Sequence, residues 1–268
     1  MIGAIIGDIA GSRFEFHNYR RKDFTLFAPD CMATDDSIMS LAIAEALMKS
    51  RPDDSNLAEN TVRYMQSVGR HYPDCGYGGR FYHWIFSDHP HPYNSFGNGS
   101  AMRVSAAGFA AVSLEDAKKK AEIVTAVSHN HPEGIKGAVA TAEAIYLART
   151  GYDKEEIRKR ITEEYYPINF TLDEIRDSYR FNETCQETVP QALEAFFEST
   201  DFEDAIRCSV SVGGDSDTLA AICGGIAEAY YGVPDDMREQ AISYLDDRLR
   251  DILIRFEEIY PPKHTEGI

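Results

Sequence analysis

Two acidic motifs contain the residues of this chain that are best suited to chemistry. Thr34-Asp35-Asp36-Ser37 lies near the start of the sequence, and Gly213-Gly214-Asp215-Ser216-Asp217-Thr218 lies near its other end. Each motif precedes a run of small and apolar residues that predicts a helix. Carboxylate and hydroxyl oxygens are the ligands that Mg²⁺ and Mn²⁺ prefer. If folding brings the motifs together, they form a divalent-cation site, which favours a metal-dependent enzyme.

The second motif predicts a chain that is still turning as it enters its helix. Residues two apart, such as Asp215 and Asp217, do not share a face of a regular helix. Gly213 and Gly214 supply the freedom that such a turn needs. The helix beyond is rich in small residues, so we expect it to be buried and its two acids to need neutralisation. Helix capping explains either motif alone, because Asp and Thr are common N-caps, but the pair together favours a metal site.

Two further acids belong to the first predicted helix and the loop that follows it. Glu15 lies just past this helix, where it could be a metal ligand or a general base. The alternative for Glu15 is a solvated surface acid. Asp8 lies within the helix, and we interpret it as a supporting residue that hydrogen-bonds to its neighbours.

Two motifs in the middle of the chain are suited to binding a substrate. Gly97-Asn98-Gly99-Ser100-Ala101-Met102-Arg103 is a glycine-rich turn that opens a helix, where backbone N–H groups can receive a phosphate, although most such turns are only turns. His129 and His131 are two positions apart in a second motif, Ser128–Gly134. No thiolate or third histidine accompanies them, so we favour substrate hydrogen bonding or helix capping over zinc.

Helical periodicity extends over nearly the whole chain and predicts the all-α class, with many short to medium helices. Gly3, Gly7 and Gly11 form a stripe that predicts close contact between the first helix and a neighbour. Helix starts are predicted at Ser113, His131, Thr171 and Asp201. Other helices are expected over 38–48, 56–70, 187–199, 202–211, 217–231 and 236–257, and a long irregular segment, of a kind that is often functional, over 71–100.

Length and composition exclude several classes of protein. The 268 residues contain no long linker or repeat, so we expect one domain over 1–268. The formal net charge of −17 disfavours stable binding to nucleic acid or to an anionic membrane. The apolar start is cut short by Asp8 and is neither a signal peptide nor a membrane span. Five widely spaced cysteines indicate reduced thiols in a cytoplasmic protein.

Taken in order, the motifs resemble those of the ADP-ribosylglycohydrolase family, which includes the dinitrogenase reductase-activating glycohydrolase and the ADP-ribosyl-acceptor hydrolases. The resemblance runs from Gly3 to about Gly232. Its most specific parts are Gly7-Asp8-x-x-Gly11 with Glu15, Thr34–Ser37, Gly97–Arg103, Ser128-His129-x-His131-Pro132 and Gly213–Thr218.

The resemblance implies a compact, orthogonal all-α globule with a cleft that holds two Mg²⁺ or Mn²⁺ ions. It implies that the enzyme hydrolyses the glycosidic bond between ADP-ribose and a protein side chain or small-molecule acceptor. We expect it to act as a monomer, with Glu15, Asp36 and Asp217 as catalytic residues. The metal ligands implied are Thr34, Asp35, Asp36, Asp215, Asp217 and Thr218. The substrate-binding residues implied are Gly97, Asn98, Gly99, Ser100 and His129.

Two alternatives remain open at this point. A metal-dependent phosphohydrolase acting on nucleotides or ADP-ribose phosphates would use the same acids and the same ions. A non-catalytic binder, like the lens crystallins related to this family, would hold ADP-ribose without turnover, but that route usually discards the ligands that are present here. The sequence does not assign the acceptor, because the segments 71–96 and 180–186 are where family members differ.

Overall fold

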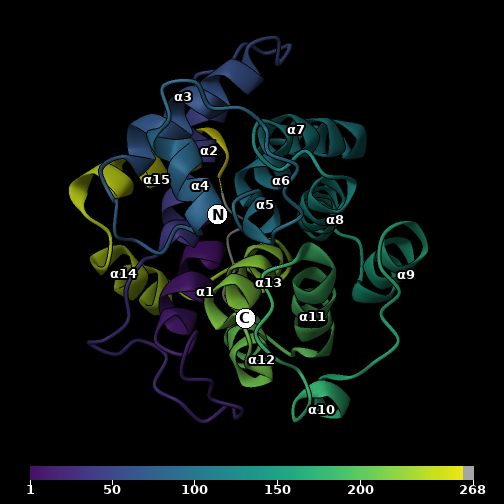
Figure 1. The fold of residues 1–268 in the computed structure, drawn as a ribbon. Helices are drawn as coiled ribbons and strands as arrows, with labels where there is room; N and C mark the ends of the chain where they lie inside the picture. Colours follow the sequence, from purple (N-terminus) through teal and green to yellow (C-terminus); the bar gives the residue numbers. More distant parts are fainter. Residues whose placement is uncertain (262–268) are drawn as a thin grey trace.

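Helices joined by loops make up this protein, and the computed structural model describes residues 1–261 (Figure 1). The predicted all-α class is confirmed. Within this range the isolated bridge between Gly97 and Thr184 is the one β-type pairing. Residues 262–268 of the expected domain lie outside the described residues.

The helices of the first half are α1 (Ile2–Ser12), α2 (Asp35–Met48), α3 (Leu57–Gly69), α4 (Gly79–Phe86), α5 (Gly99–Met102), α6 (Ser105–Ala110), α7 (Leu114–Ala126) and α8 (Pro132–Arg149). Those of the second half are α9 (Lys154–Glu164), α10 (Leu172–Ile175), α11 (Cys185–Glu198), α12 (Phe202–Val212), α13 (Ser216–Tyr231), α14 (Asp235–Ser243) and α15 (Asp247–Ile259).

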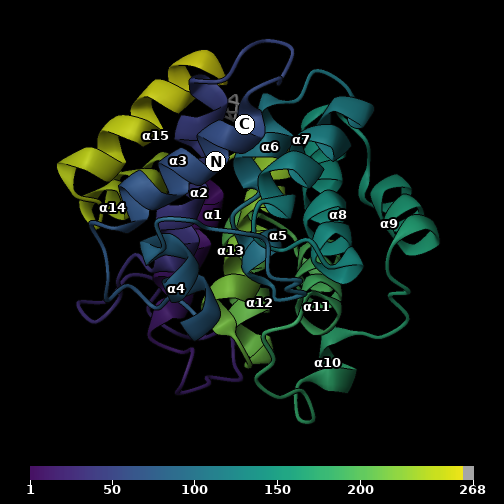
Figure 2. The same cartoon turned by 45° about the horizontal axis from the view of Figure 1, so that its top comes forward.

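Three helices form the centre of the fold because they are buried on nearly every face. All residues of α13 from Ser216 to Ala229 are buried, and so are those of α2 from Asp36 to Leu47 and of α1 from Ile2 to Gly11. A helix that is apolar all round must lie inside the protein. Figures 1 and 2 show α14 and α15 on one side of this centre and α7, α8 and α9 on the other.

The glycine stripe of α1 lies directly against α13, as predicted. A Cβ atom at Gly3 would overlap the carbonyl oxygen of Gly224, one at Gly7 would overlap that of Ala220, and one at Gly11 would meet the backbone of Asp217. The backbones of the two helices therefore touch without intervening side chains, and this contact holds the start of α13 beside α1.

Local capping accounts for where several helices begin. The side chains of Ser113, Asp201 and Thr171 each accept a hydrogen bond from the amide three residues ahead, as their predicted helix starts require. Nδ1 of His131 accepts a hydrogen bond from the amide of Glu133, 3.1 Å away, and thereby caps α8. Capping was one of the two roles predicted for the histidine pair.

Two expectations for the secondary structure are wrong, and one helix was not expected. The segment 71–100 is not irregular throughout, because Phe81, Trp84 and Ile85 bury one side of α4. The helix expected over 236–257 is two helices, since Asp246 caps a new start by accepting from the amide of Leu249 at 3.0 Å. α9 has no counterpart among the expected helices.

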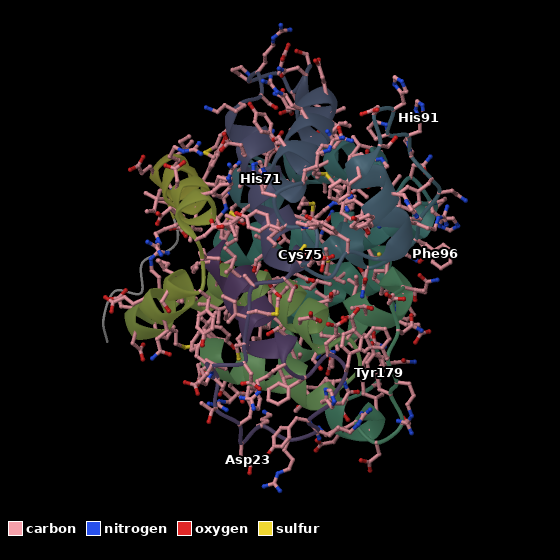
Figure 3. The ribbon with its side chains drawn as sticks, turned by 60° about the vertical axis from the view of Figure 1, so that its left-hand side comes forward. Asp23, His71, Cys75, His91, Phe96 and Tyr179 are labelled. Atoms are coloured by element: carbon pink, nitrogen blue, oxygen red, sulfur yellow. The ribbon has the colours of Figure 1, made fainter. Side chains whose placement is uncertain are left out.

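The rest of the segment 71–100 runs between the interior and the surface. Figure 3 shows His91 and Phe96 at the periphery and Cys75 nearer the centre of the molecule. Phe96 is 43% exposed, whereas Cys75 is buried.

Gly7→Ala is expected to destabilise the protein by about 2–3 kcal/mol, because neither backbone can move aside for the new methyl group. The measurement is the free energy of unfolding in urea. Gly79→Ala is the matched control, since nothing lies within 4 Å of a Cβ there, and it should change stability by less than about 1 kcal/mol. Equal stabilities of the two variants would contradict the proposed backbone contact.

Candidate active site

The two acidic motifs meet where α2 and α13 begin. The hydroxyl of Thr218 on α13 donates a hydrogen bond to Oδ2 of Asp36 on α2, 3.3 Å away and 182 positions apart in sequence. Carboxylate oxygens of Asp8, Asp36 and Asp217 lie within 4.8 Å of one another. The expectation that the motifs come together in the fold is therefore confirmed.

A second group of acids shares one member with the first. Carboxylate oxygens of Glu15, Asp215 and Asp217 also lie within 4.8 Å of one another. Asp217 thus belongs to both groups of three. It is the acid that connects Asp8 and Asp36 with Glu15 and Asp215.

Asp8 fastens the first turn of α2 to α1. Its carboxylate accepts hydrogen bonds from the amide of Thr34 at 2.9 Å, the hydroxyl of Thr34 at 2.6 Å and the amide of Ser37 at 3.1 Å. The hydroxyl of Ser37 donates a fourth. Three of these bonds end on Oδ2 and one on Oδ1, so Oδ2 is fully occupied while Oδ1 keeps a free lone pair. The interpretation of Asp8 as a supporting residue is confirmed.

The three acidic-motif residues at the start of α2 differ in what they face. Thr34 is the N-cap, and its hydroxyl donates to Asp8 and accepts from the amide of Asp36 at 3.3 Å. Thr34 is not among the residues that line the cleft described below, whereas Asp35 and Asp36 both are.

α13 begins with the gradual turn predicted from its sequence. Gly213 and Gly214 have φ angles of 76° and 73°, in the left-handed region that favours glycine. Asp215 is the N-cap and Asp217 lies in the first helical turn, so the two carboxylates converge. Nδ2 of Asn98 donates to Oδ2 of Asp215 at 2.7 Å and orients it.

Burial and mutual repulsion disfavour negative charge in this cluster. Burial, and after it the charges of Asp8 and Asp35, raise the pKa of Asp36 well above its usual range. Burial, followed by the charges of Asp215 and Asp36, does the same to the pKa of Asp217. Oδ1 of Asp36 is buried and has no hydrogen-bond partner among residues 1–261. An orphaned carboxylate oxygen among like charges fits a bound cation.

Glu15 faces the same cluster from the loop after α1. It is only partly buried, and it lines the cleft together with Asp215 and Asp217. Burial, and then the charge of Asp215, raise its pKa to about 7. A carboxyl group that titrates near neutral pH can exchange a proton with water during a reaction.

The cluster forms one wall of a cleft of about 320 Å³, and the glycine-rich turn forms a second wall, which the hydrogen bond from Asn98 to Asp215 joins to the first. The lining residues of the turn are Gly97, Asn98 and Gly99, with His129 beside them. The amide of Asn98 donates to the carbonyl of Glu183 at 2.7 Å, so this amide is already used. The amide of Gly99 makes no such bond within the described residues and is available to a ligand.

Ser100 lies behind the turn and does not line the cleft. It is fully buried, and its hydroxyl is 3.0 Å from the carbonyl oxygen of Gly97 and 2.8 Å from that of Gly134. The hydroxyl thus ties the turn to α8, which is a positioning role in this structure.

The cleft residues that sequence reasoning did not identify include Arg80, Phe81, Tyr93 and Glu183. Arg80 lies over the ring of Tyr93, with 4.7 Å between its guanidinium carbon and the ring centroid. The only signal for three of them is their place in the long segment 71–100, which was expected to be functional without any residue being named.

Comparison with known proteins identifies the family. The model of the ADP-ribosylglycohydrolase family matches residues 1–262. The human ADP-ribosylhydrolase ARH3 is 25% identical, over 91% of this chain and 88% of its own length. The ADP-ribosyl-[dinitrogen reductase] glycohydrolase of Rhodospirillum rubrum is 26% identical, over 91% of this chain and 88% of its own length.

A third relative and a solved structure agree with this result. The ADP-ribosylarginine hydrolase Tri1 of Pseudomonas putida is 28% identical, over 87% of this chain and 70% of its own length. A solved structure titled ADP-ribosylglycohydrolase-related protein complex superposes with a TM-score of 0.66 over 97% of this chain and 95% of that one, at 21% identity. The chain belongs to the ADP-ribosylglycohydrolase family, and it is an enzyme that hydrolyses the glycosidic linkage of ADP-ribose.

Proposed function

We propose that the acidic cluster holds two divalent cations, Mg²⁺ or Mn²⁺, and that the enzyme uses them to release ADP-ribose from an acceptor. The observation that carries this proposal is the shared position of Asp217, whose carboxylate belongs to both groups of three acids. All the candidate ligands offer oxygen atoms, which suits these hard ions. Bound cations supply Lewis-acid polarisation of ribose hydroxyls and offset the charge of the cluster.

The proposed ligands are those expected from the sequence. Asp36, Asp215 and Asp217 have the strongest support, because each belongs to one of the groups of converging acids. Thr218 is held beside Asp36 by its hydrogen bond. Asp35 reaches the cleft. The hydroxyl of Thr34 donates to Asp8, so Thr34 caps α2 in this structure. To become a metal ligand, its hydroxyl would have to give up this hydrogen bond.

Glu15 is the general base in this proposal. It faces the cleft on a loop, and its partly buried carboxyl can take a proton from the water that attacks the anomeric carbon. Glycosidic cleavage passes through an oxocarbenium-like state, which the carboxylates of Asp36 and Asp217 stabilise electrostatically. The acceptor leaves with the electron pair of the broken bond and takes up a proton, which balances the proton that Glu15 accepts from water.

The wall formed by the glycine-rich turn orients the substrate. Gly99 and His129 line the cleft, where the amide of Gly99 and the ring of His129 bind the diphosphate of ADP-ribose. Asn98 links this wall to the acids through its bond to Asp215. Binding the diphosphate at a fixed distance from the cluster places the reacting ribose among the acids, which lowers the entropic cost of reaction.

We place the enzyme in the cytoplasm as a monomer that acts on ADP-ribosylated proteins or small molecules. All five cysteines are free and buried, which suits a reducing compartment. One chain supplies both walls of the cleft. A bilayer-spanning segment would need a longer apolar helix than residues 1–261 contain.

Chelation of divalent cations should abolish the release of ADP-ribose from conjugates and lower the Tm, because the cations bind only the folded chain. At a cation concentration of 100 times Kd, the stabilisation is about 2.7 kcal/mol. Product chromatography and thermal unfolding, with EDTA and after Mg²⁺ or Mn²⁺ is restored, measure both effects. Full turnover in EDTA, or release of inorganic phosphate in place of ADP-ribose, would contradict the proposal.

Asp217→Asn should reduce kcat by at least about 100-fold, since it removes a ligand shared by both groups of acids. Without cations the same variant should be no less stable than the parent, because a repulsive charge is gone. Steady-state kinetics and Tm shifts on adding Mg²⁺ are the measurements. Asp236→Asn, the same change at an exposed acid on α14, is the control. Parental activity in Asp217→Asn would remove the two-cation site.

In the cation-free protein, Asp35 should make stability fall as pH rises from 5 to 8. Burial raises the pKa of Asp35 from 3.8 to about 8, so the folded chain keeps a proton that the unfolded chain has already released. Its favourable contribution is full below the unfolded pKa and is lost as pH rises toward 8. Urea unfolding of the parent and Asp35→Asn isolates this effect, and a stability difference that does not change with pH would refute it.

A further inference from the structure

Arg103 is a buried cation without a carboxylate partner. It follows the glycine-rich turn, it is fully buried, and no ion pair involves it among residues 1–261. Its Nε and Nη1 atoms have no hydrogen-bond partner within the described residues. Its guanidinium carbon lies 5.3 Å from the ring centroid of Phe81. Burial lowers the pKa of Arg103 to about 10, so it remains charged at neutral pH.

The shortest hydrogen bond of the buried guanidinium is the one to Ser128. Nη2 of Arg103 donates to Oγ of Ser128 at 2.8 Å, and this Oγ lies 2.9 Å from Nδ1 of His129. Guanidinium groups only donate, so Ser128 must accept from Arg103. Ser128 is fully buried, and Nδ1 of His129 is the remaining partner for its own proton.

This arrangement decides which ring nitrogen of His129 carries a proton. Nδ1 accepts from Ser128, and it also lies 3.5 Å from Nη2 of Arg103, where a proton on Nδ1 would face another N–H group. Burial, and then the charges of Arg103 and Arg80, lower the pKa of His129 well below its usual range, so the ring is neutral. The proton of a neutral ring must then be on Nε2.

The ring is also held in orientation by its neighbours. The centroid of Tyr93 lies 5.5 Å and that of Phe81 6.0 Å from the imidazole centroid, both in edge-to-face geometry. Nε2 faces the glycine-rich turn, because a Cβ atom at Gly99 would lie 3.4 Å and one at Gly97 3.7 Å from it. Nε2 makes no hydrogen bond within residues 1–261, so its N–H is available to a ligand in the cleft.

We propose that Arg103 and Ser128 are positioning residues that hold His129 as the Nε2–H tautomer, so that it always presents a donor to a phosphate oxygen of the substrate. The identity of that oxygen rests on the proposed function, in which the diphosphate of ADP-ribose binds at this turn. Phosphate oxygens only accept, so the opposite tautomer would place a lone pair against them. The hydrogen bonds from Arg103 to Ser128 and from Ser128 to His129 thus favour binding of an anionic acceptor group at Nε2. They oppose a metal ion there, because a metal would need the unprotonated nitrogen.

Nitrogen NMR of the full-length protein labelled at the histidine rings tests the tautomer directly. The signals of His129 are identified by their loss in His129→Gln. We expect the Nε2–H pattern in the parent and a mixture of both neutral tautomers in the double variant Arg103→Met/Ser128→Ala, which removes both donors to Nδ1. Ser209→Ala, which removes a buried hydroxyl bonded to the carbonyl of Ala205 on its own helix, should leave the pattern unchanged. An Nδ1–H pattern in the parent would overturn the proposal.

Binding of ADP-ribose tests what the donor is for. Glutamine at position 129 can place an N–H near Nε2, whereas asparagine places its amide near Nδ1. We expect His129→Gln to bind ADP-ribose within about fivefold of the parent and His129→Asn to bind at least about tenfold more weakly, as loss of a hydrogen bond to a charged group predicts. Equal weakening in both variants would overturn the role of Nε2. A parent with the Nε2–H pattern that fails to bind ADP-ribose would instead refute the proposed function.

Discussion

The burial of several carboxylates at one point is the constraint on which the rest of this structure depends. Isolated buried charges are costly, and here Asp8, Asp36 and Asp217 approach within 4.8 Å of one another. The fold offsets part of this cost. Asp8 accepts four hydrogen bonds, and α2 and α13 both begin at the cluster, so their positive helix ends face it. The orphaned Oδ1 of Asp36 shows that the hydrogen bonds within residues 1–261 leave this compensation incomplete.

The two walls of the cleft have opposite electrical character, and this polarity suits ADP-ribose. In the proposed function the acid wall holds the cations, and the cations bind sugar hydroxyls. The other wall contains Arg80, Arg103 and a neutral His129, which suit the proposed diphosphate. An enzyme with a formal net charge of −17 can therefore bind an anion, because the local arrangement outweighs the distant field. Asn98 joins the two walls, since its side chain holds Asp215 while its backbone belongs to the glycine-rich turn.

Much of the fold and of the site could be predicted because it depends on local chemistry. The glycine stripe, the entry into α13 and the role of Asp8 follow from residue types and spacing, and all are confirmed. The break at Asp246 was missed because the apolar pattern continues across it. The inward direction of Ser100 and the contact between Arg103 and Ser128 depend on how distant segments pack, which no local pattern contains.

The backbone contact between α1 and α13 limits how this enzyme can open and close. Packed helices usually shift by sliding over side chains that change rotamer, but the carbonyl of Ala220 lies directly beneath Gly7 and leaves no such layer. Asp8 and Asp217 are attached to these two backbones, so the contact between the helices fixes the spacing of the two acids. The loop after α1 and the irregular parts of the segment 71–100 lie outside this contact, so changes in them need not alter the spacing between Asp8 and Asp217.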